Sequence, residues 1–383
     1  MRVLFWSGTF WPNIGGVEVL AAKLLPALRE RGYEYLVVVP RNDPKLSEEA
    51  DYKGIPICRV SFRNDLTDKS IEHFVAVREK ISALKRSFAP DLIHINAVGV
   101  DNFFHLSTKN THPAPLLVTL HGEWQLQADA VVRDLLRAAD WVAGCSAAIL
   151  TEGQKLAPEI APRSSIIYNG MDAPSVLPTP LSFDTPRLLC LGRLVPEKGM
   201  DLALAAFATL VPRFPRARLI VAGDGAARSG LEHQAADLHI SHAVDFAGWV
   251  APDQVPAMIN NSTIVLMPSR YETFGLVALE AALMTRPVIA ARVGGLPEIV
   301  AHQQTGLLIE REDSRGLAGA ISFLLENPEA AVQMGLAARR RVQTVFSWER
   351  HVDAYDALYQ KLISKVTPAV RSPSSYQRRR QDG

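Results

Sequence analysis

Short apolar runs alternate with amphipathic segments along the first half of the chain. The apolar runs are rich in β-branched and aromatic residues and are too short for helices, so they are typical of buried strands. The pattern predicts strands at 2–7, 35–40, 91–96, 116–120, 141–145 and 164–168, and helices at 71–88, at 131–139 and from Val17 to a terminating Gly32. Pro26 lies inside the first helix and is expected to kink or shorten it. Strands and helices that alternate in this way predict a parallel, doubly wound α/β sheet.

The alternation stops in a segment with four prolines and then starts again. The second series predicts strands near 187–191, 217–222, 243–247, 264–267, 287–291 and 306–309, followed by helices near 313–326, 328–345 and 347–365. We therefore predict two Rossmann-like domains that face each other across a cleft. The predicted divisions are an N-terminal domain at 1–171, a linker at 172–186, a C-terminal domain at 187–365 whose last helix packs back toward the N-terminal domain, and a disordered tail at 366–383.

Composition narrows the class of protein. The chain has 383 residues and a net charge of +1, which argues against a dedicated nucleic-acid binder. No apolar stretch reaches membrane-spanning length, and the N-terminus enters a strand without a signal-peptide pattern. Three scattered cysteines without metal-type spacing favour a reducing, cytoplasmic location. The basic run Arg378 to Arg380 in the tail leaves peripheral contact with a membrane open.

The segment from Pro268 to Met284 carries the most distinctive pattern. It follows an apolar run and reads as a loop that leads into an almost entirely apolar helix. Glu272 precedes the helix start, where unpaired backbone N–H groups attract anions, and Glu280 lies among the apolar helix residues. Two glutamates thus bracket a helix N-terminus that could hold a phosphate. The alternative is an exposed loop Glu272 and a Glu280 that reaches solvent or a buried arginine.

A second candidate loop follows the first strand of the C-terminal domain. Arg193 and Lys198 lie five residues apart in this loop, between Gly192 and Gly199, and two such cations suit a diphosphate. An ordinary solvated loop with surface cations remains the alternative.

Glycines follow the next two strands of the same domain. Gly223-Asp224-Gly225 does not complete a nicotinamide-binding fingerprint, since Arg228 stands where the third glycine should be. The alternative interpretation of Gly223-Asp224-Gly225 is a tight turn that lets a ligand approach the backbone. Trp249 and Val250 could offer an apolar wall to a nucleobase, or could form a plain turn with a tryptophan at the edge of the core.

The N-terminal domain contributes weaker signals. Gly15 and Gly16 precede its first helix, where free N–H groups favour a phosphate. His121 ends a strand and is followed by Gly122, so its side chain is expected in the cleft, although a lone histidine is more often a satisfied core or surface residue. Asn169-Gly170 reads as a turn.

Taken together and in this order, these motifs resemble those of the family 4 glycosyltransferases over about residues 1–365. The resemblance implies a GT-B fold, a nucleotide-diphosphate sugar as donor, and transfer with retention of the anomeric configuration without a cofactor or a metal ion. It implies donor-binding roles for Gly15, Gly16, Arg193, Lys198, Gly223, Trp249, Val250, Glu272, Phe274, Gly275, Leu276 and Glu280, and catalytic roles for His121, Glu272, Arg193 and Lys198.

By this resemblance, Arg193 and Lys198 neutralise the donor diphosphate, and Glu280 binds the ribose hydroxyls. Glu272 contacts the sugar, and His121 lies near the reacting carbon. Alternatives are a nucleotide-sugar epimerase or phosphorylase with the same fold, and a non-catalytic scaffold; the failed glycine fingerprint disfavours a dehydrogenase. The acceptor, the sugar, the choice between uridine and guanosine and the oligomeric state stay open.

Overall fold

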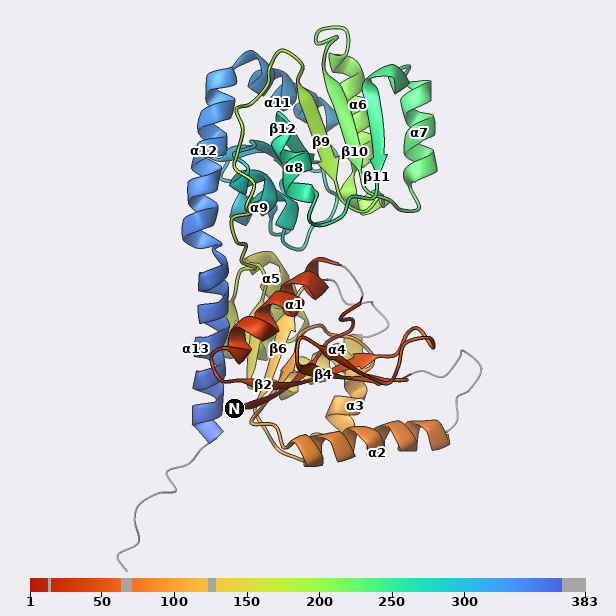
Figure 1. Ribbon diagram of the computed structural model, residues 1–383, viewed down its shortest axis with the longest axis vertical. Helices are drawn as coiled ribbons and strands as arrows, with labels where there is room; N and C mark the ends of the chain where they lie inside the picture. The colour runs from red at the N-terminus through yellow and green to blue at the C-terminus, as the bar shows by residue number, and fades with distance from the viewer. Residues whose placement is uncertain (13–14, 63–70, 123–128, 367–383) are drawn as a thin grey trace, which may run out of the picture.

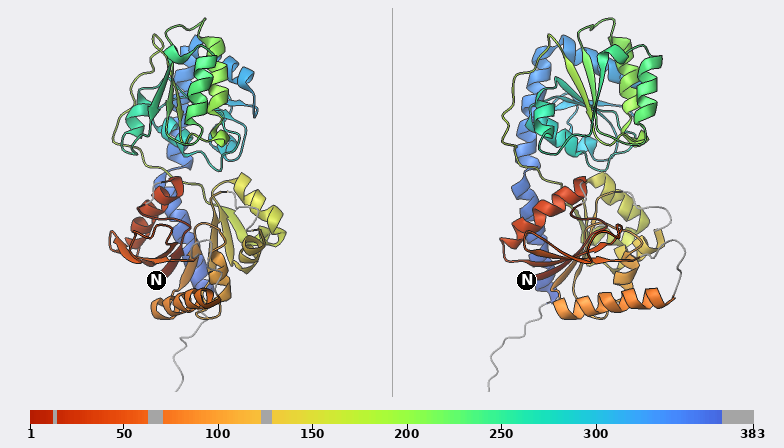
Figure 2. Two further views of the ribbon diagram at one scale, coloured as in Figure 1. Left: turned by 90° about the vertical axis from the view of Figure 1, so that its right-hand side faces the viewer. Right: turned by 45° about the vertical axis from the view of Figure 1, so that its right-hand side comes forward.

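The computed structural model describes residues 1–12, 15–62, 71–122 and 129–366. Two α/β domains lie one above the other, and the last two long helices run along one side of both (Figures 1 and 2). Among the helices of these ranges, none combines the length and the apolar composition that crossing a membrane requires.

The N-terminal sheet has the strand order β3-β4-β2-β1-β5-β6-β7-β8. Its strands are β1 (Arg2–Trp6), β2 (Glu34–Pro40), β3 (Glu49–Tyr52), β4 (Ile55–Val60), β5 (Leu92–Ile95), β6 (Leu116–Leu120), β7 (Trp141–Gly144) and β8 (Ser164–Ile166). All pairs are parallel except the edge pair β3–β4, which the sequence pattern did not predict. This pair is antiparallel because Lys53 and Gly54, both with positive φ, form a tight hairpin turn.

The helices of this domain are α1 (Gly16–Arg29), α2 (Ile71–Phe88), α3 (Asn102–Ser107), α4 (Asp129–Ala138) and α5 (Ala147–Leu156). Pro26 does not shorten the first helix, since α1 continues through it to Arg29, and the alternative expectation of a kink stays a prediction. Leu24, Leu25 and Leu28 on either side of the proline are buried in the core, and this packing outweighs one lost backbone hydrogen bond.

The C-terminal sheet has the order β11-β10-β9-β12-β13-β14, and all its pairs are parallel. Its strands are β9 (Arg187–Leu191), β10 (Arg218–Ala222), β11 (Val244–Gly248), β12 (Ile264–Met267), β13 (Val288–Ala291) and β14 (Gly306–Ile309), close to the predicted bounds. Its helices are α6 (Met200–Leu210), α7 (Arg228–Asp237), α8 (Val255–Asn260), α9 (Leu276–Leu283), α10 (Leu296–Ile299) and α11 (Ser314–Glu326). Both faces of β9 and β12 are buried, as their continuous apolar sequences predict.

The chain returns to the N-terminal domain at its end. Helix α12 (Pro328–Val345) packs on the C-terminal domain, and α13 (Trp348–Val366) continues beside the N-terminal domain (Figure 1). In α13, Asp353 pairs with Arg31 at 2.6 Å, and Tyr359 hydrogen-bonds the buried His94 at 2.6 Å. The residues that follow Val366 lie outside the described part of the chain, so the predicted disorder of the tail stays a prediction.

Candidate active site

The centre of the C-terminal sheet brings two distant loops together. The strands β10 and β11 lie on one side of β9, and β12, β13 and β14 lie on the other, so the winding reverses between β9 and β12. Ligands of open α/β sheets bind at the carboxyl ends of the strands at such a reversal. Lys198, after β9, and Glu272, after β12, form an ion pair here, with 2.7 Å between Nζ and Oε2. The Glu272 side chain is only 11% exposed, so solvent screens this pair weakly.

Close backbone packing fixes the two loops against each other. Gly199 has a φ of +65°, and a β-carbon at this position would collide with the carbonyl oxygen of Pro268. The Arg270 amide donates to the carbonyl of Glu197 at 2.8 Å, and its guanidinium makes two 2.7 Å bonds to Asp201. These bonds hold the pKa of Asp201 below its usual value. Sequence reasoning did not identify Arg270 as a support for the site, although it lies inside the predicted motif.

A small cavity of about 50 Å³ opens between these loops. Its lining includes Gly192, Lys198, Ser269, Glu272 and Val277.

Arg193, the second predicted cation of the site, takes no part in the Lys198–Glu272 ion pair. The Arg193 side chain is exposed, and no residue of the described ranges hydrogen-bonds or pairs with its guanidinium. Arg193 therefore lies in the predicted loop with its charge available to a ligand.

The tip of α9 offers main-chain donors beside the ion pair. Its N-cap residue, Gly275, has a φ of +115°, and a β-carbon there would lie 2.7 Å from Leu296, so a glycine is required. Within the described ranges, the amides of Phe274, Gly275 and Leu276 donate to no other protein group. Three N–H groups without a partner among the described residues, at a helix start, can bind an anion.

The side chain of Phe274 points away from this tip. It is buried, and its ring packs against Tyr168 and Phe346 at centroid distances of 6.1 and 6.0 Å. Phe274 can therefore contact a ligand through its backbone, as the resemblance implied, but not through its ring.

Glu280 lies on the first turns of α9. Its carboxylate is half-buried and has no hydrogen-bond or ion-pair partner among the described residues. Burial raises its pKa to about 7. A half-buried carboxylate without a protein partner can accept hydrogen bonds from ligand hydroxyl groups, which is the arrangement that ribose binding requires.

The glycine turns of the neighbouring strands approach the same loop. The Gly223 amide donates to the Gly248 carbonyl at 2.7 Å, and a β-carbon on Gly223 would collide with the carbonyl of Gly192. Trp249 is 64% exposed, and Val250 is partly buried against the core. Trp249 thus presents an open aromatic surface at the carboxyl edge of this sheet.

The N-terminal domain has its own pocket of about 210 Å³ at the carboxyl ends of β1, β5 and β6. It is lined by Ser7, Thr9, Val17, Glu18, Ala97, Val98, His121 and Gly122.

His121 lines this pocket with a buried imidazole ring. Its Nε2 lies 3.1 Å from the side-chain oxygen of Asn96, which assigns the proton to Nε2. Its Nδ1 is buried and has no hydrogen-bond partner among the described residues. Burial lowers the pKa of His121 to about 3, so the ring is neutral.

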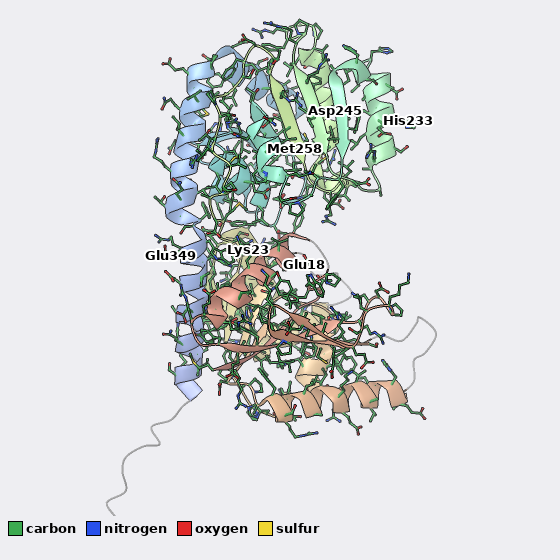
Figure 3. The ribbon with its side chains drawn as sticks, in the orientation of Figure 1. Glu18, Lys23, His233, Asp245, Met258 and Glu349 are labelled. Carbon is green, nitrogen blue, oxygen red and sulfur yellow. The ribbon has the colours of Figure 1, made fainter. Side chains whose placement is uncertain are left out.

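Glu18 is a pocket residue that sequence reasoning missed. Its carboxylate accepts a hydrogen bond from the Thr9 hydroxyl and folds over Gly15, leaving no room there for a β-carbon. Figure 3 shows Glu18 at the end of α1 that faces the C-terminal domain. The predicted phosphate-friendly helix start thus already holds a carboxylate of the protein. The Gly15-Gly16 pair, followed two residues later by Glu18, was the available sequence signal.

The two halves of the site meet across the domain boundary. A β-carbon on Gly16 would lie 2.9 Å from a methyl group of Leu276. A β-carbon on Gly122 would lie 3.5 Å from the Thr273 methyl group. The structure thus brings the His121 pocket to the loop that carries Glu272.

Two family models match the chain. The model described as Glycosyltransferase Family 4 matches residues 14–173, and the model described as Glycosyl transferases group 1 matches residues 179–341. The chain belongs to the GT-B glycosyltransferases. The predicted family and fold class are confirmed, and the functional roles of the individual site residues stay predictions.

Named relatives show what this glycosyltransferase is similar to. It is 29% identical to a glycogen synthase of Mycobacterium tuberculosis H37Rv over 94% of both chains. It is 35% identical to a GDP-mannose-dependent alpha-(1-6)-phosphatidylinositol monomannoside mannosyltransferase of the same species, over 43% of this chain and 45% of the relative.

Solved structures share its fold. A sucrose-phosphate synthase from Thermosynechococcus elongatus superposes with a TM-score of 0.82 at 24% identity, covering 95% of this chain and 99% of that one. HepE from Anabaena, solved in complex with UDP, gives a TM-score of 0.78 at 22% identity, covering 94% and 100%.

The raised pKa of Glu280 predicts a dependence of stability on pH. Because the folded protein holds the Glu280 proton up to about pH 7, whereas the unfolded chain releases it near pH 4.5, Glu280 should lower stability as pH rises through this window. We expect the free energy of unfolding of the wild-type protein to fall by about 2 kcal/mol more than that of Glu280→Gln between pH 5 and pH 8. Urea unfolding at both values measures this difference.

Glu310→Gln is the matched control, because the Glu310 side chain is 73% exposed. Equal pH dependence in the wild type and in Glu280→Gln would show that the Glu280 carboxyl is not desolvated.

Proposed function

We propose that this glycosyltransferase moves a hexose-type sugar from a nucleotide-diphosphate sugar to a hydroxyl group of an acceptor, with retention of the anomeric configuration. One observation carries the proposal: the Lys198–Glu272 pair lies beside the free amides at the tip of α9. A cation and a helix start at one place suit a diphosphate, and an adjacent carboxylate suits a sugar hydroxyl.

The proposed mechanism depends on the negative charge that develops on the leaving diphosphate. When the bond between the anomeric carbon and the diphosphate breaks, negative charge grows on the leaving oxygen. Lys198 and the amides of α9 stabilise this charge from fixed positions, and Arg193 supplies a second cation, so the protein provides the positive charge that a metal ion supplies in other transferases. Groups that are already oriented lower the barrier because they need not reorganise during the reaction.

Retention requires the acceptor to end on the face that the diphosphate leaves. We propose same-face attack: the acceptor hydroxyl forms the new bond to the anomeric carbon, its proton passes to the leaving phosphate oxygen, and a nucleoside diphosphate is released. His121, which lines the pocket of the N-terminal domain, lies near the reacting carbon of the donor sugar and helps to orient the sugar ring. Glu280 accepts hydrogen bonds from the ribose.

The nucleotide is either uridine or guanosine diphosphate. The solved HepE structure contains UDP, whereas the mannosyltransferase relative is named for GDP-mannose. The acceptor class that we propose is a growing glycan, polysaccharide or glycolipid, and we propose that the reaction takes place in the cytoplasm.

A thermal-shift screen identifies the donor. We expect UDP or GDP and its sugars to raise the melting temperature, since a ligand at 100 times its Kd adds about 2.7 kcal/mol of stability. ATP and free hexoses serve as controls. No stabilisation by any nucleoside diphosphate or nucleotide sugar would contradict the proposal.

Lys198→Ala tests the stabilisation of the leaving group. We expect it to lower the rate of nucleoside diphosphate release from the selected donor, with water as acceptor, by about 10²–10³-fold, because one charge-stabilising donor is lost. Lys155→Ala, which removes an exposed lysine of α5, is the control and should keep the wild-type rate. The released sugar, followed by NMR before mutarotation, should keep the donor's anomeric configuration. An inverted sugar, or a sugar trapped covalently on a side chain, would contradict same-face attack.

A further inference from the structure

Glu298 links the two domains through a helix start. It belongs to α10 of the C-terminal domain, but its carboxylate reaches α5 of the N-terminal domain. Oε2 accepts a hydrogen bond from the Ala147 amide at 2.9 Å, and Oε1 accepts one from the Ala148 amide at 3.2 Å. These are the first two amides of α5, which no carbonyl of the helix can satisfy. The contact is a charged, two-pronged bond to a helix N-terminus.

The residue that caps α5 adds a second bond across the same boundary. The Ser146 hydroxyl accepts a hydrogen bond from the Ile149 amide at 3.2 Å and donates one to the carbonyl of Thr273 at 2.8 Å. Thr273 follows Glu272 directly in the loop of the candidate active site. One helix start therefore holds both α10 and this loop.

The turn that carries Glu298 is built against the same loop. The Gly295 amide donates to the Glu272 carbonyl at 3.3 Å, and a β-carbon on Gly294 would collide with that carbonyl. The guanidinium of Arg341 donates to the Glu298 carbonyl at 2.7 Å. Glu298 is thus fixed relative to Glu272, and a force on its carboxylate acts on the Glu272 loop.

On the other side of the boundary, α5 is fixed relative to His121. Helix α5 follows β7, and β7 pairs with β6 so that Gly144 lies opposite Leu120, the residue before His121. The bond from Glu298 to α5 therefore sets the distance between His121 in one domain and Glu272 in the other.

We propose that Glu298 is a positioning residue that holds the two domains together by binding the N-terminus of α5. When the carboxylate leaves the Ala147 and Ala148 amides, the domains separate and His121 moves away from the Glu272 loop. The proposal concerns how closely the two domains approach and does not depend on which nucleotide the donor carries.

Two substitutions remove this bond from opposite sides. Glu298→Gln keeps the size of the side chain but replaces one acceptor oxygen with an NH₂ group that faces an amide donor. Ala147→Pro removes one of the two donating amides and leaves the helix favourable, because proline is preferred at the first helical position. The preceding residue, Ser146, already has the extended backbone that proline requires, with φ −150° and ψ 162°.

The first measurement is small-angle scattering of the ligand-free protein. We expect a larger radius of gyration for Glu298→Gln and for Ala147→Pro than for the wild type. Glu310→Gln, which changes an exposed carboxylate at the end of β14, is the matched control and should scatter like the wild type. Because no ligand is present, this measurement is independent of the proposed donor.

The second measurement is the rate of nucleoside diphosphate release from UDP-glucose and from GDP-mannose. We expect each single variant to lower kcat/KM about tenfold, as for the loss of one charge-assisted hydrogen bond. The double variant should show about the same tenfold loss rather than about a hundredfold loss, because both changes break one contact.

The proposal is overturned if both variants scatter like the wild type. It is also overturned if their rate losses multiply in the double variant, because independent effects would then explain them. If the variants have a larger radius of gyration but the wild type cleaves neither nucleotide sugar, the proposed role of Glu298 is supported and the proposed donor is wrong.

Discussion

The ion pair between Lys198 and Glu272 depends on the pairing of β9 with β12, and the rest of the site is arranged around it. The chain winds outward in opposite directions from these two strands, so the loops that follow them meet without a helix between them. Gly199 lets the two backbones touch, and Arg270 ties the loops together. A cation, a carboxylate and the start of α9 are therefore held in one place before any ligand arrives.

The N-terminal domain completes this arrangement with neutral and acidic groups. Its pocket is lined by the neutral His121 and by Glu18, so the basic groups of the site that the structure describes lie on the C-terminal side. This division suits a reaction in which one domain holds the charged leaving group while the other presents polar groups to the sugar and acceptor. In our proposal, the hydrogen bonds between Glu298 and the start of α5 determine how closely the two domains approach.

Local sequence patterns predicted most strands and helices that are continuously buried. They did not predict features that depend on contacts between distant parts of the chain. The apolar run of β12 was sufficient because both of its faces are covered. Both hairpin strands were missed: β3 is a short edge strand of alternating exposure, and β4 carries the exposed Pro56 near its start. The loops of the candidate active site were identified in the sequence because each has glycines or charged residues directly after an apolar strand sequence. Glu298 was not found, because its partner amides lie about 150 residues earlier in the chain. Glu18 was not found although its partner Thr9 is near in the sequence, because the pattern does not show how the loop between them folds.

We expect Lys198 and the amides at the tip of α9 to bind the second phosphate of a nucleotide. Isothermal titration with the nucleoside diphosphate and monophosphate of the same base measures how much this phosphate adds to binding. The wild type should bind the diphosphate about tenfold or more tightly than the monophosphate, and Lys198→Ala should remove most of this preference. Equal affinity for the two nucleotides in the wild type, or an unchanged preference in Lys198→Ala, would contradict it.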